Sequence, residues 1–320
     1  MRIGTRVSSR NKEIPVAVIS GPTAAGKSRI ATEVAVACGG EVVSADSMQV
    51  YGGVPVLTDQ PSASLLTTVP HHLVGTVPLD EEYSAARFAR EAAAAIEEIS
   101  RRRRLPLVAG GTGLYVRALL GNFSFAGRSG PEPRRKWEKF IASQGIVAAL
   151  NELSRLDPES AAFVDAGNPR RLARALEAAE SSIPLSAERS RLWSGDSPYR
   201  VLFFGLELPR PELYRRIDAR VDAMLAGGAA GEVRAALQGK VSRTAAQAIG
   251  FVEISALLAG EAGPEETAAA IKQRSRRYAK RQLTWMRKMP DVVRIDLTGS
   301  NVAQAARDIA GRIRQAGLVS

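Results

Sequence analysis

An eight-residue segment near the N-terminus has the spacing of a phosphate-binding loop. Gly21–Ser28 reads GPTAAGKS and matches the pattern GxxxxGK[ST]. Its glycines let backbone N–H groups turn towards an anion, Lys27 supplies a positive charge, and the Ser28 hydroxyl can hold Mg²⁺. The match could be a coincidence, but an apolar run (Pro15–Ser20) precedes the loop and a helical pattern (Ser28–Cys38) follows it. We therefore predict a diphosphate site. The residues expected to bind the diphosphate are Gly21, Pro22, Thr23, Ala24, Ala25, Gly26, Lys27 and Ser28.

The loop pattern does not identify the compound that carries the diphosphate. Most such loops hold ATP or GTP, which favours a kinase or another NTPase. However, the strand predicted at Leu105–Ala109 ends in Gly110-Gly111 and lacks the aspartate that usually holds the metal there. Asp46 instead follows the strand predicted at Glu41–Ser44, near the loop at the ligand-binding edge of the sheet. It could cap a turn, or it could take a proton from a nucleophile beside the diphosphate. Small-molecule kinases also place an acid here, so both classes remain open.

The spacing of apolar residues predicts the elements that position this site. Short strands alternate with helices such as Ala85–Ser100, and a further strand is expected at Tyr199–Leu208. This alternation indicates an α/β fold with a parallel sheet flanked by helices. From roughly Pro131 to Ser181 the pattern is helical only. We expect a P-loop α/β core at 14–125 and 199–320, and an all-helical insertion domain at 126–198.

Charge and composition indicate a polyanionic partner. The 320 residues carry a formal net charge of +11, and neutralising phosphates releases condensed counterions, so nucleic acid is the simplest partner. Lys272–Lys288 contains eight Lys or Arg and no acid, which favours phosphate contact over a solvated face, while Tyr278 and Trp285 are expected to pack inward.

The single Cys38 excludes an internal disulfide. No apolar run approaches the roughly 20 residues that span a bilayer, so no membrane association is expected.

Several segments in register resemble the tRNA dimethylallyltransferase (tRNA isopentenyltransferase) family of the bacterial type. The segments, in chain order, are GPTAAGKS, SADSMQVYGG, VPHHLVG, YSAARF, LPLVAGGTGLYVRALL, NPRRLARALE and YAKRQLTWMRK. They span about residues 15–290. The resemblance implies transfer of a dimethylallyl group from dimethylallyl diphosphate to the exocyclic amine of the adenosine 3′-adjacent to the anticodon, with release of diphosphate. It also implies a cytoplasmic enzyme.

The resemblance assigns roles to individual residues. Asp46 matches the general base, whereas Thr23, Lys27, Arg220 and Mg²⁺ near Ser28 match the groups that stabilise the departing diphosphate. The insertion matches the part that grips the anticodon stem-loop. Positions matching tRNA contacts are Asp46, Ser47, Met48, Gln49, Thr112, Arg134, Arg170, Arg171, Arg174, Lys280, Arg281, Gln282 and Arg287. We expect tRNA and dimethylallyl diphosphate as partners, Mg²⁺ as cofactor, and a monomer.

Two stretches depart from the family pattern. GMDIGTAKP is replaced by GGVPVLTDQP, so that a family lysine becomes Gln60, and AIGYKE is replaced by AIGFVE, with Val252 for a basic residue. A paralogue with another acceptor is therefore a minority hypothesis. Three more functions stay open: a prenyltransferase acting on free adenine nucleotides, a small-molecule kinase, and an RNA-binding P-loop protein without catalysis.

Overall fold

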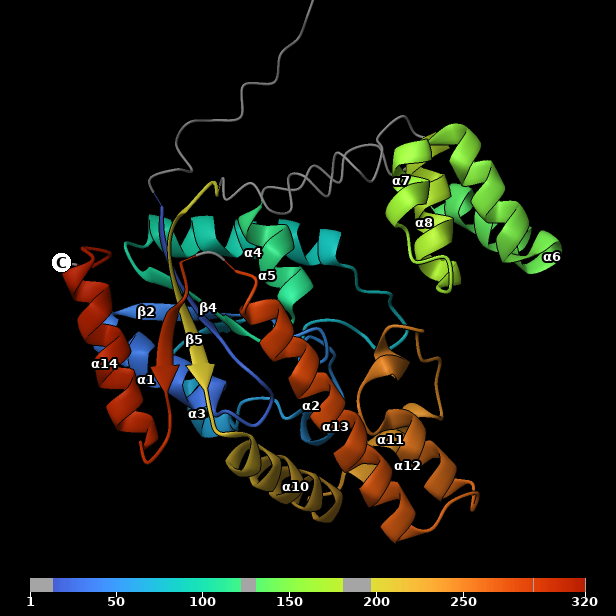
Figure 1. Ribbon diagram of the computed structural model, residues 1–320. Coiled ribbons are helices and arrows are strands. Elements are labelled where there is room, and N and C mark those ends of the chain that lie inside the picture. Colours follow the sequence, from blue (N-terminus) through green and yellow to red (C-terminus); the bar gives the residue numbers. More distant parts are fainter. Residues whose placement is uncertain (1–13, 122–130, 181–196, 290, 320) are drawn as a thin grey trace, which may run out of the picture. The chain divides into compact units, whose positions relative to one another are not determined.

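The computed structural model describes residues 14–121, 131–180, 197–289 and 291–319. Over these residues the chain divides into two compact units, Met1–Leu120 with Ser197–Ser320, and Gly121–Asp196. The first unit contains the sheet and the second contains only helices among its described residues (Figure 1). None of the described helices has both the length and the apolar character needed to cross a membrane.

A parallel sheet of six strands forms the centre of the first unit, in the order β3-β2-β4-β1-β5-β6. The strands are β1 (Pro15–Ser20), β2 (Gly40–Ser44), β3 (His71–His72), β4 (Leu105–Gly110), β5 (Arg200–Glu207) and β6 (Val293–Asp296). The adjacent strands β2 and β4 are buried along their whole length, as expected for a parallel sheet that helices cover on both faces. The predicted α/β class is confirmed. The two-residue β3 was not predicted, because so short a run carries no periodicity.

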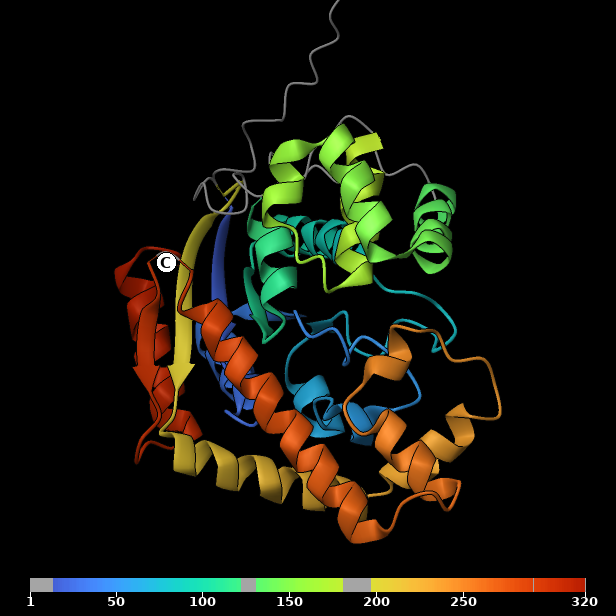
Figure 2. The ribbon, with the colours of Figure 1, turned by 45° about the vertical axis from the view of Figure 1, so that its right-hand side comes forward.

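Helices cover both faces of this sheet (Figure 2). On one face, α1 and α14 pack their apolar residues with Ile19 and Phe204 of the sheet. On the other, α4 and α5 pack with Val18, Val108 and Phe203. The helices of this unit are α1 (Lys27–Cys38), α2 (Pro55–Thr58), α3 (Ala63–Thr68), α4 (Ala85–Arg101), α5 (Gly113–Leu120), α10 (Arg210–Ala226), α11 (Ala229–Ala236), α12 (Phe251–Leu258), α13 (Pro264–Met286) and α14 (Val302–Gln315).

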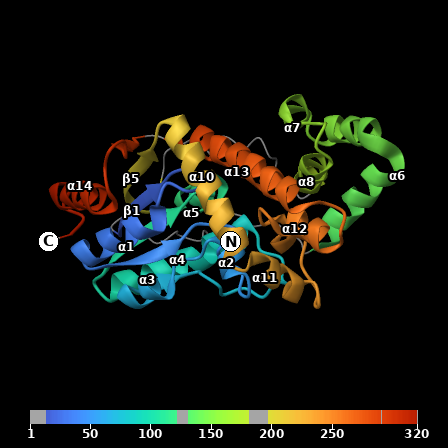
Figure 3. The same ribbon diagram turned by 90° about the horizontal axis from the view of Figure 1, so that it is seen from below.

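Two of these helices lie side by side and carry residues of the site. Helices α10 and α13 adjoin each other along part of their length in the view from below (Figure 3). Lys272 of α13 lies 2.6 Å from Asp222 of α10, and Arg276 lies 2.5 Å from Asp218. These ion pairs fix the two helices against each other.

The second unit has a hydrophobic core of its own. It comprises α6 (Pro131–Leu156), α7 (Pro158–Phe163) and α8 (Pro169–Glu180). Trp137, Leu153, Leu172 and Leu176 are buried together between α6 and α8. Gly145 interrupts α6 with φ +83°, a conformation that glycine adopts without strain. A separate apolar core is the minimum requirement for an inserted domain to fold as a unit.

Candidate active site at the carboxyl end of the sheet

The phosphate-binding loop lies between β1 and α1, as predicted. Gly26 caps α1 with φ +82°, which an L side chain rarely adopts. Lys27 Nζ donates to the carbonyl oxygen of Pro22 at 2.9 Å, so the lysine folds back over the loop. Burial lowers the pKa of Lys27 to about 8, an effect that Asp46 and Asp59 oppose and the charge of Arg220 strengthens. Burial leaves the ammonium group of Lys27 poorly solvated, so a bound anion would stabilise its charged form.

The end of β4 brings the Asp46 loop close to the phosphate-binding loop. A Cβ on Gly110 would lie 2.3 Å from the carbonyl oxygen of Ala45, and one on Gly111 would lie 1.9 Å from Nε2 of Gln282. At Gly110 only glycine permits this approach, because the atoms that a Cβ would meet belong to the backbone. The lack of an aspartate at this strand end therefore has a packing cause as well as the functional meaning assumed from the sequence.

The carboxylate of Asp46 both holds a turn and lines the pocket. Its Oδ1 accepts a hydrogen bond from the N–H of Met48 at 2.9 Å, so the capping interpretation is correct for one oxygen. Because this bond uses only Oδ1, Oδ2 keeps its lone pairs for a proton. Next to Asp46, the N–H of Ser47 donates to Thr112 Oγ1 at 3.1 Å, and Thr112 Oγ1 lies 3.4 Å from the hydroxyl of Tyr278. Burial and the charge of Asp46 raise the pKa of Tyr278 to about 12, so this phenol stays protonated.

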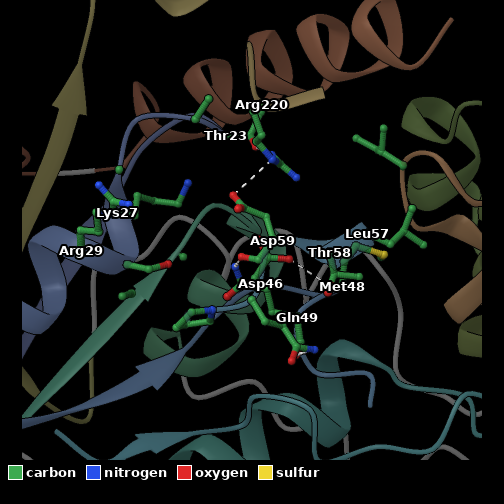
Figure 4. Close-up of a pocket in the computed structure, with 18 of the residues that line it drawn as sticks. Thr23, Lys27, Arg29, Asp46, Met48, Gln49, Leu57, Thr58, Asp59 and Arg220 are labelled. Atoms are coloured by element: carbon green, nitrogen blue, oxygen red, sulfur yellow. Dashed lines mark hydrogen bonds and ion pairs between the residues drawn. The ribbon is translucent and has the colours of Figure 1, made fainter. Parts of the chain in front are cut away.

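Arg220 reaches the loop from helix α10. Its Nη1 donates to the hydroxyl of Thr23, and its Nε lies 3.2 Å from Oδ2 of Asp59 (Figure 4). In the sequence Arg220 is 197 residues from Thr23, so only the tertiary structure joins them. Arg220 and Lys27 provide two positive charges for one anion.

These groups enclose a pocket of about 270 Å³ with two chemically different parts. Lys27, Arg29 and Arg220 form the cationic part, next to the Ser28 hydroxyl. The apolar surface elsewhere in the wall comes from Leu57, Leu65, Met48, Ala248 and Ile249. Figure 4 shows Met48, Leu57 and Thr58 on one side, Lys27 and Arg29 on the opposite side, and Asp46 and Asp59 between them. Such a pocket suits a ligand with an anionic group at one end and a short apolar group at the other.

The structure brings together most of the residues predicted for this site. The predicted residues that line the pocket are Thr23, Ala24, Gly26, Lys27, Ser28, Asp46, Met48, Gln49 and Arg220. Gly21, Pro22 and Ala25 belong to the loop but do not line the pocket. Ser47 and Thr112 do not line the pocket and are hydrogen-bonded to each other.

Gln282, expected to contact tRNA, faces the phosphate-binding loop instead. Its side chain is 5 % exposed, and its Oε1 accepts a hydrogen bond from the N–H of Thr23 at 2.7 Å. In this conformation it offers little accessible surface to an RNA. The reason is rotational: a 100° step per residue places Gln282 on the inner face of α13, away from the exposed Lys280 and Arg281.

The basic helix α13 is also less available to phosphates than its sequence indicates. Three of its cations have acidic partners on neighbouring helices, including the pair between Arg274 and Glu253 at 3.0 Å. The absence of acids within the segment concealed these pairs, because the acids come from elsewhere in the chain. The exposed cations of the segment are Arg277, Lys280, Arg281, Arg287 and Lys288. Trp285 packs over Gly113, where an added Cβ would lie 2.7 Å from Cγ of the indole, but it is half-buried and not a core residue.

The predicted tRNA contacts of the helical unit lie on α6 and α8. Arg170 and Arg171 are exposed, while Arg134 and Arg174 are half-buried. Arg134 pairs with Glu138 at 3.1 Å, and Arg171 pairs with Asp165 at 3.0 Å. Because exposed pairs of this kind are weak, these cations remain able to exchange a carboxylate for a phosphate.

Sequence reasoning missed Asp59 and the apolar part of the pocket. Asp59 follows α2 with φ +55°, a conformation that aspartate tolerates better than most residues. Its ion pair with Arg220 joins residues 161 positions apart, and no sequence motif predicts it. Gln60, noted only as a departure from the family pattern, donates to the carbonyl oxygens of Gln49 and Tyr51 at 3.0 and 2.7 Å. Its amide thus fixes the loop that carries Gln49.

The fold and the site define a parallel α/β protein with a GxxxxGK[ST] loop and an acid at the carboxyl end of its sheet. The family model described as IPP transferase matches residues 49–289. The chain is 42 % identical over 297 residues to tRNA dimethylallyltransferase 1 of Citrifermentans bemidjiense, covering 92 % of this chain and 96 % of that protein. It is 40 % identical to the tRNA dimethylallyltransferase of Desulforudis audaxviator, covering 94 % and 98 %.

Solved structures agree with this similarity. The full-length tRNA isopentenylpyrophosphate transferase of Bacillus halodurans superposes with a TM-score of 0.70 at 37 % identity, covering 95 % of this chain and 96 % of that one. A eukaryotic dimethylallyltransferase acting on tRNA superposes with a TM-score of 0.80 at 30 % identity, covering 93 % and 77 %. The chain therefore belongs to the IPP transferase family and is an enzyme of the tRNA dimethylallyltransferase type.

Proposed function

We propose that this enzyme transfers a dimethylallyl group from dimethylallyl diphosphate to the exocyclic amine of the adenosine 3′-adjacent to the anticodon of a tRNA. The observation that carries the proposal is the placement of Asp46 in one pocket with Lys27 and Arg220. The pocket thus holds a candidate base beside the groups suited to a leaving diphosphate, with apolar wall for five carbons.

The transfer exchanges one bond for another. The bond between C1 of the allyl group and the diphosphate oxygen breaks, and a bond forms between C1 and the adenine nitrogen. The proton of that nitrogen passes to Asp46, and the electron pair of the broken bond leaves with the diphosphate. Because negative charge develops on the departing oxygens, Lys27, Arg220 and the Thr23 hydroxyl stabilise the transition state more than the ground state.

The residues present fit Mg²⁺ bound together with a diphosphate. The Ser28 hydroxyl lines the same pocket as Lys27 and Arg220, and oxygen is the ligand atom that Mg²⁺ prefers. The described residues contain no cluster of three or more His, Cys, Asp or Glu that would form a metal cage. Such a site suits an ion that takes one or two protein oxygens and completes its shell with diphosphate oxygens and water. When bound, Mg²⁺ would neutralise charge on the leaving diphosphate.

The acceptor must enter with its base unstacked, because the amine of a stacked base is hard to reach. We assign recognition of this base to Asp46–Gln49. Phosphate contacts we assign to Lys280 and Arg281 on α13, to Arg287 directly after it, and to Arg134, Arg170, Arg171 and Arg174 on the helical unit. The exposure of Lys280, Arg281 and Arg170 supports this assignment. We further expect the enzyme to act as a monomer in the cytoplasm.

A transfer assay tests the proposal. Radiolabelled dimethylallyl diphosphate, Mg²⁺ and unmodified tRNA with an adenosine-rich anticodon loop are incubated with the enzyme, with AMP and ATP as parallel acceptors. We expect label in tRNA alone, and none when EDTA replaces Mg²⁺. Label in AMP would identify a nucleotide prenyltransferase, and consumption of ATP without transfer would identify a kinase; either result contradicts the proposal.

A further inference from the structure

The hydrogen bond between Gln282 and the phosphate-binding loop assigns this glutamine a task that no motif indicates. Its Oε1 accepts the N–H of Thr23 at 2.7 Å, although the two residues are 259 positions apart. The donor is a backbone N–H, so the oxygen of the amide must face Thr23 and the NH₂ group must face away. The orientation of this side chain is therefore set by the hydrogen-bond pattern itself.

The same glutamine is held tightly on its other side. Its side chain is 5 % exposed, and its Nε2 is buried with no hydrogen-bond partner among the residues the structure describes. A Cβ added to Gly111 would lie 1.9 Å from this Nε2 atom. A buried NH₂ group without a partner is costly, and the hydrogen bond that Oε1 accepts from Thr23 offsets part of this cost.

That bond determines which loop amides face the anion. A phosphate-binding loop works by turning successive N–H groups inward on the diphosphate. Gln282 takes up the N–H of Thr23, which keeps the N–H of Thr23 away from the anion and fixes the residue whose hydroxyl bonds to Arg220. The loop is thereby anchored before a diphosphate arrives, so less conformational entropy is lost on binding.

We propose that Gln282 is a positioning residue for the diphosphate site, acting through Thr23, and that it does not contact tRNA. The proposal rests on the proposed function for the identity of the anion. Its place on α13 gives that helix two separate tasks: the inner face anchors the loop, while the exposed Lys280 and Arg281 face outward. A substitution on the inner face should therefore affect diphosphate binding, and a substitution on the outer face should affect RNA binding.

The test compares Gln282→Met with Gln273→Met, the same substitution at an exposed position of the same helix. Methionine keeps the length of the side chain but cannot accept from Thr23. Binding of inorganic diphosphate with Mg²⁺ and of an anticodon stem-loop RNA are measured separately by calorimetry. We expect Gln282→Met to raise the Kd for diphosphate roughly tenfold, as befits an orphaned buried N–H, with the RNA Kd within about twofold of wild type. Gln273→Met should change neither.

A second measurement separates anchoring from general loosening. Hydrogen exchange of the amide of Thr23 should become faster in Gln282→Met, while amides of β1 and β4 keep their wild-type rates. If Gln282→Met does not fold, Gln282→Glu keeps an acceptor oxygen for Thr23 but adds a negative charge behind the loop. In this variant the amide of Thr23 should still exchange slowly, whereas the affinity for diphosphate should fall.

Weaker RNA binding with unchanged diphosphate affinity in Gln282→Met would overturn the proposal and restore a tRNA contact. Unchanged diphosphate affinity in Gln282→Met, or fast exchange of the Thr23 amide in Gln282→Glu, would overturn it equally. If wild type itself failed to bind diphosphate, the proposed function would fail first, and the two failures are thus distinguishable.

Discussion

Arg220 and Asp59 form an ion pair in the pocket, with Nε of the arginine 3.2 Å from Oδ2 of the aspartate. The pair places a negative charge beside a cation that we assign to the diphosphate. The carboxylate of Asp59 is 58 % exposed, so solvent screens this charge strongly. The charge of Asp59 therefore weakens binding of an anion only slightly.

We expect Asp59→Asn to tighten binding of inorganic diphosphate by roughly two- to fivefold, because an exposed charge contributes at most about 1 kcal/mol. Calorimetry at fixed Mg²⁺ measures the change. Asp80→Asn, which removes an exposed charge that does not line the pocket, should leave the affinity unaltered. Weaker binding by Asp59→Asn would instead mean that Asp59 orients Arg220 for the ligand or holds the metal.

Asp46→Asn should lower the rate of transfer by roughly 100- to 10,000-fold, since asparagine cannot take the proton of the attacking amine. The asparagine side-chain oxygen can still accept from the N–H of Met48, so the turn at the end of β2 should survive. Single-turnover kinetics measure the rate, and affinities for diphosphate and for tRNA serve as controls. A parallel loss of both affinities would assign Asp46 a structural role only.

Diphosphate affinity should depend on pH through Lys27. The pKa of its ammonium is lowered to about 8 from 10.5, and a bound anion favours the protonated form and raises that pKa again. Affinity should therefore be constant below about pH 7 and fall above pH 8, by up to tenfold per pH unit until the pH reaches the pKa of Lys27 in the complex.

The stability of the fold should depend on pH in the opposite direction. Between pH 8 and 10.5 the unfolded chain binds the extra proton, so the free energy of unfolding should rise with pH.

Dividing the wild-type affinity by that of Lys27→Arg at each pH removes the ionisation of diphosphate itself, because arginine keeps its charge throughout this range. Calorimetry in buffers of different ionisation enthalpy should also report uptake of about half a proton at pH 8. A ratio that stays flat from pH 7 to 10 would show that Lys27 remains protonated in the free enzyme.

The cations of α13 should divide into two groups when they are neutralised. Lys280→Gln and Arg281→Gln should weaken tRNA binding and each reduce the slope of log K against log salt by roughly one. Arg274→Gln should instead lower stability by about 1–3 kcal/mol, because Glu253, whose side chain is 14 % exposed, loses its partner. Filter binding between 50 and 200 mM salt and thermal unfolding provide the two measurements. An equal change of salt slope for all three variants would refute the division.

Local patterns predicted strands β1, β2, β4 and β5 and the loop after β1, because each depends on neighbours in sequence. Pro15–Ser20, the loop up to Ser28 and the helix that follows it need only the apolar run, the glycines and the helical period. The position of Asp46 at the pocket also followed from the rule that parallel strands end at one edge. The two-residue strand β3 and the exact strand ends did not follow, since pairing and not propensity determines them.

The sequence by itself thus determined what is local: a GxxxxGK[ST] loop between a strand and a helix, an acid after the second strand, a basic helix and a helical segment. Tertiary structure alone decided which of those charges remain available. It paired Lys272, Arg274 and Arg276 with acids of other helices, brought Arg220 to Thr23, and turned Gln282 inward to the loop. The physical reason is that electrostatic and hydrogen-bond energies depend on distance in space, and contacts between residues far apart in the chain leave no periodic trace in the sequence.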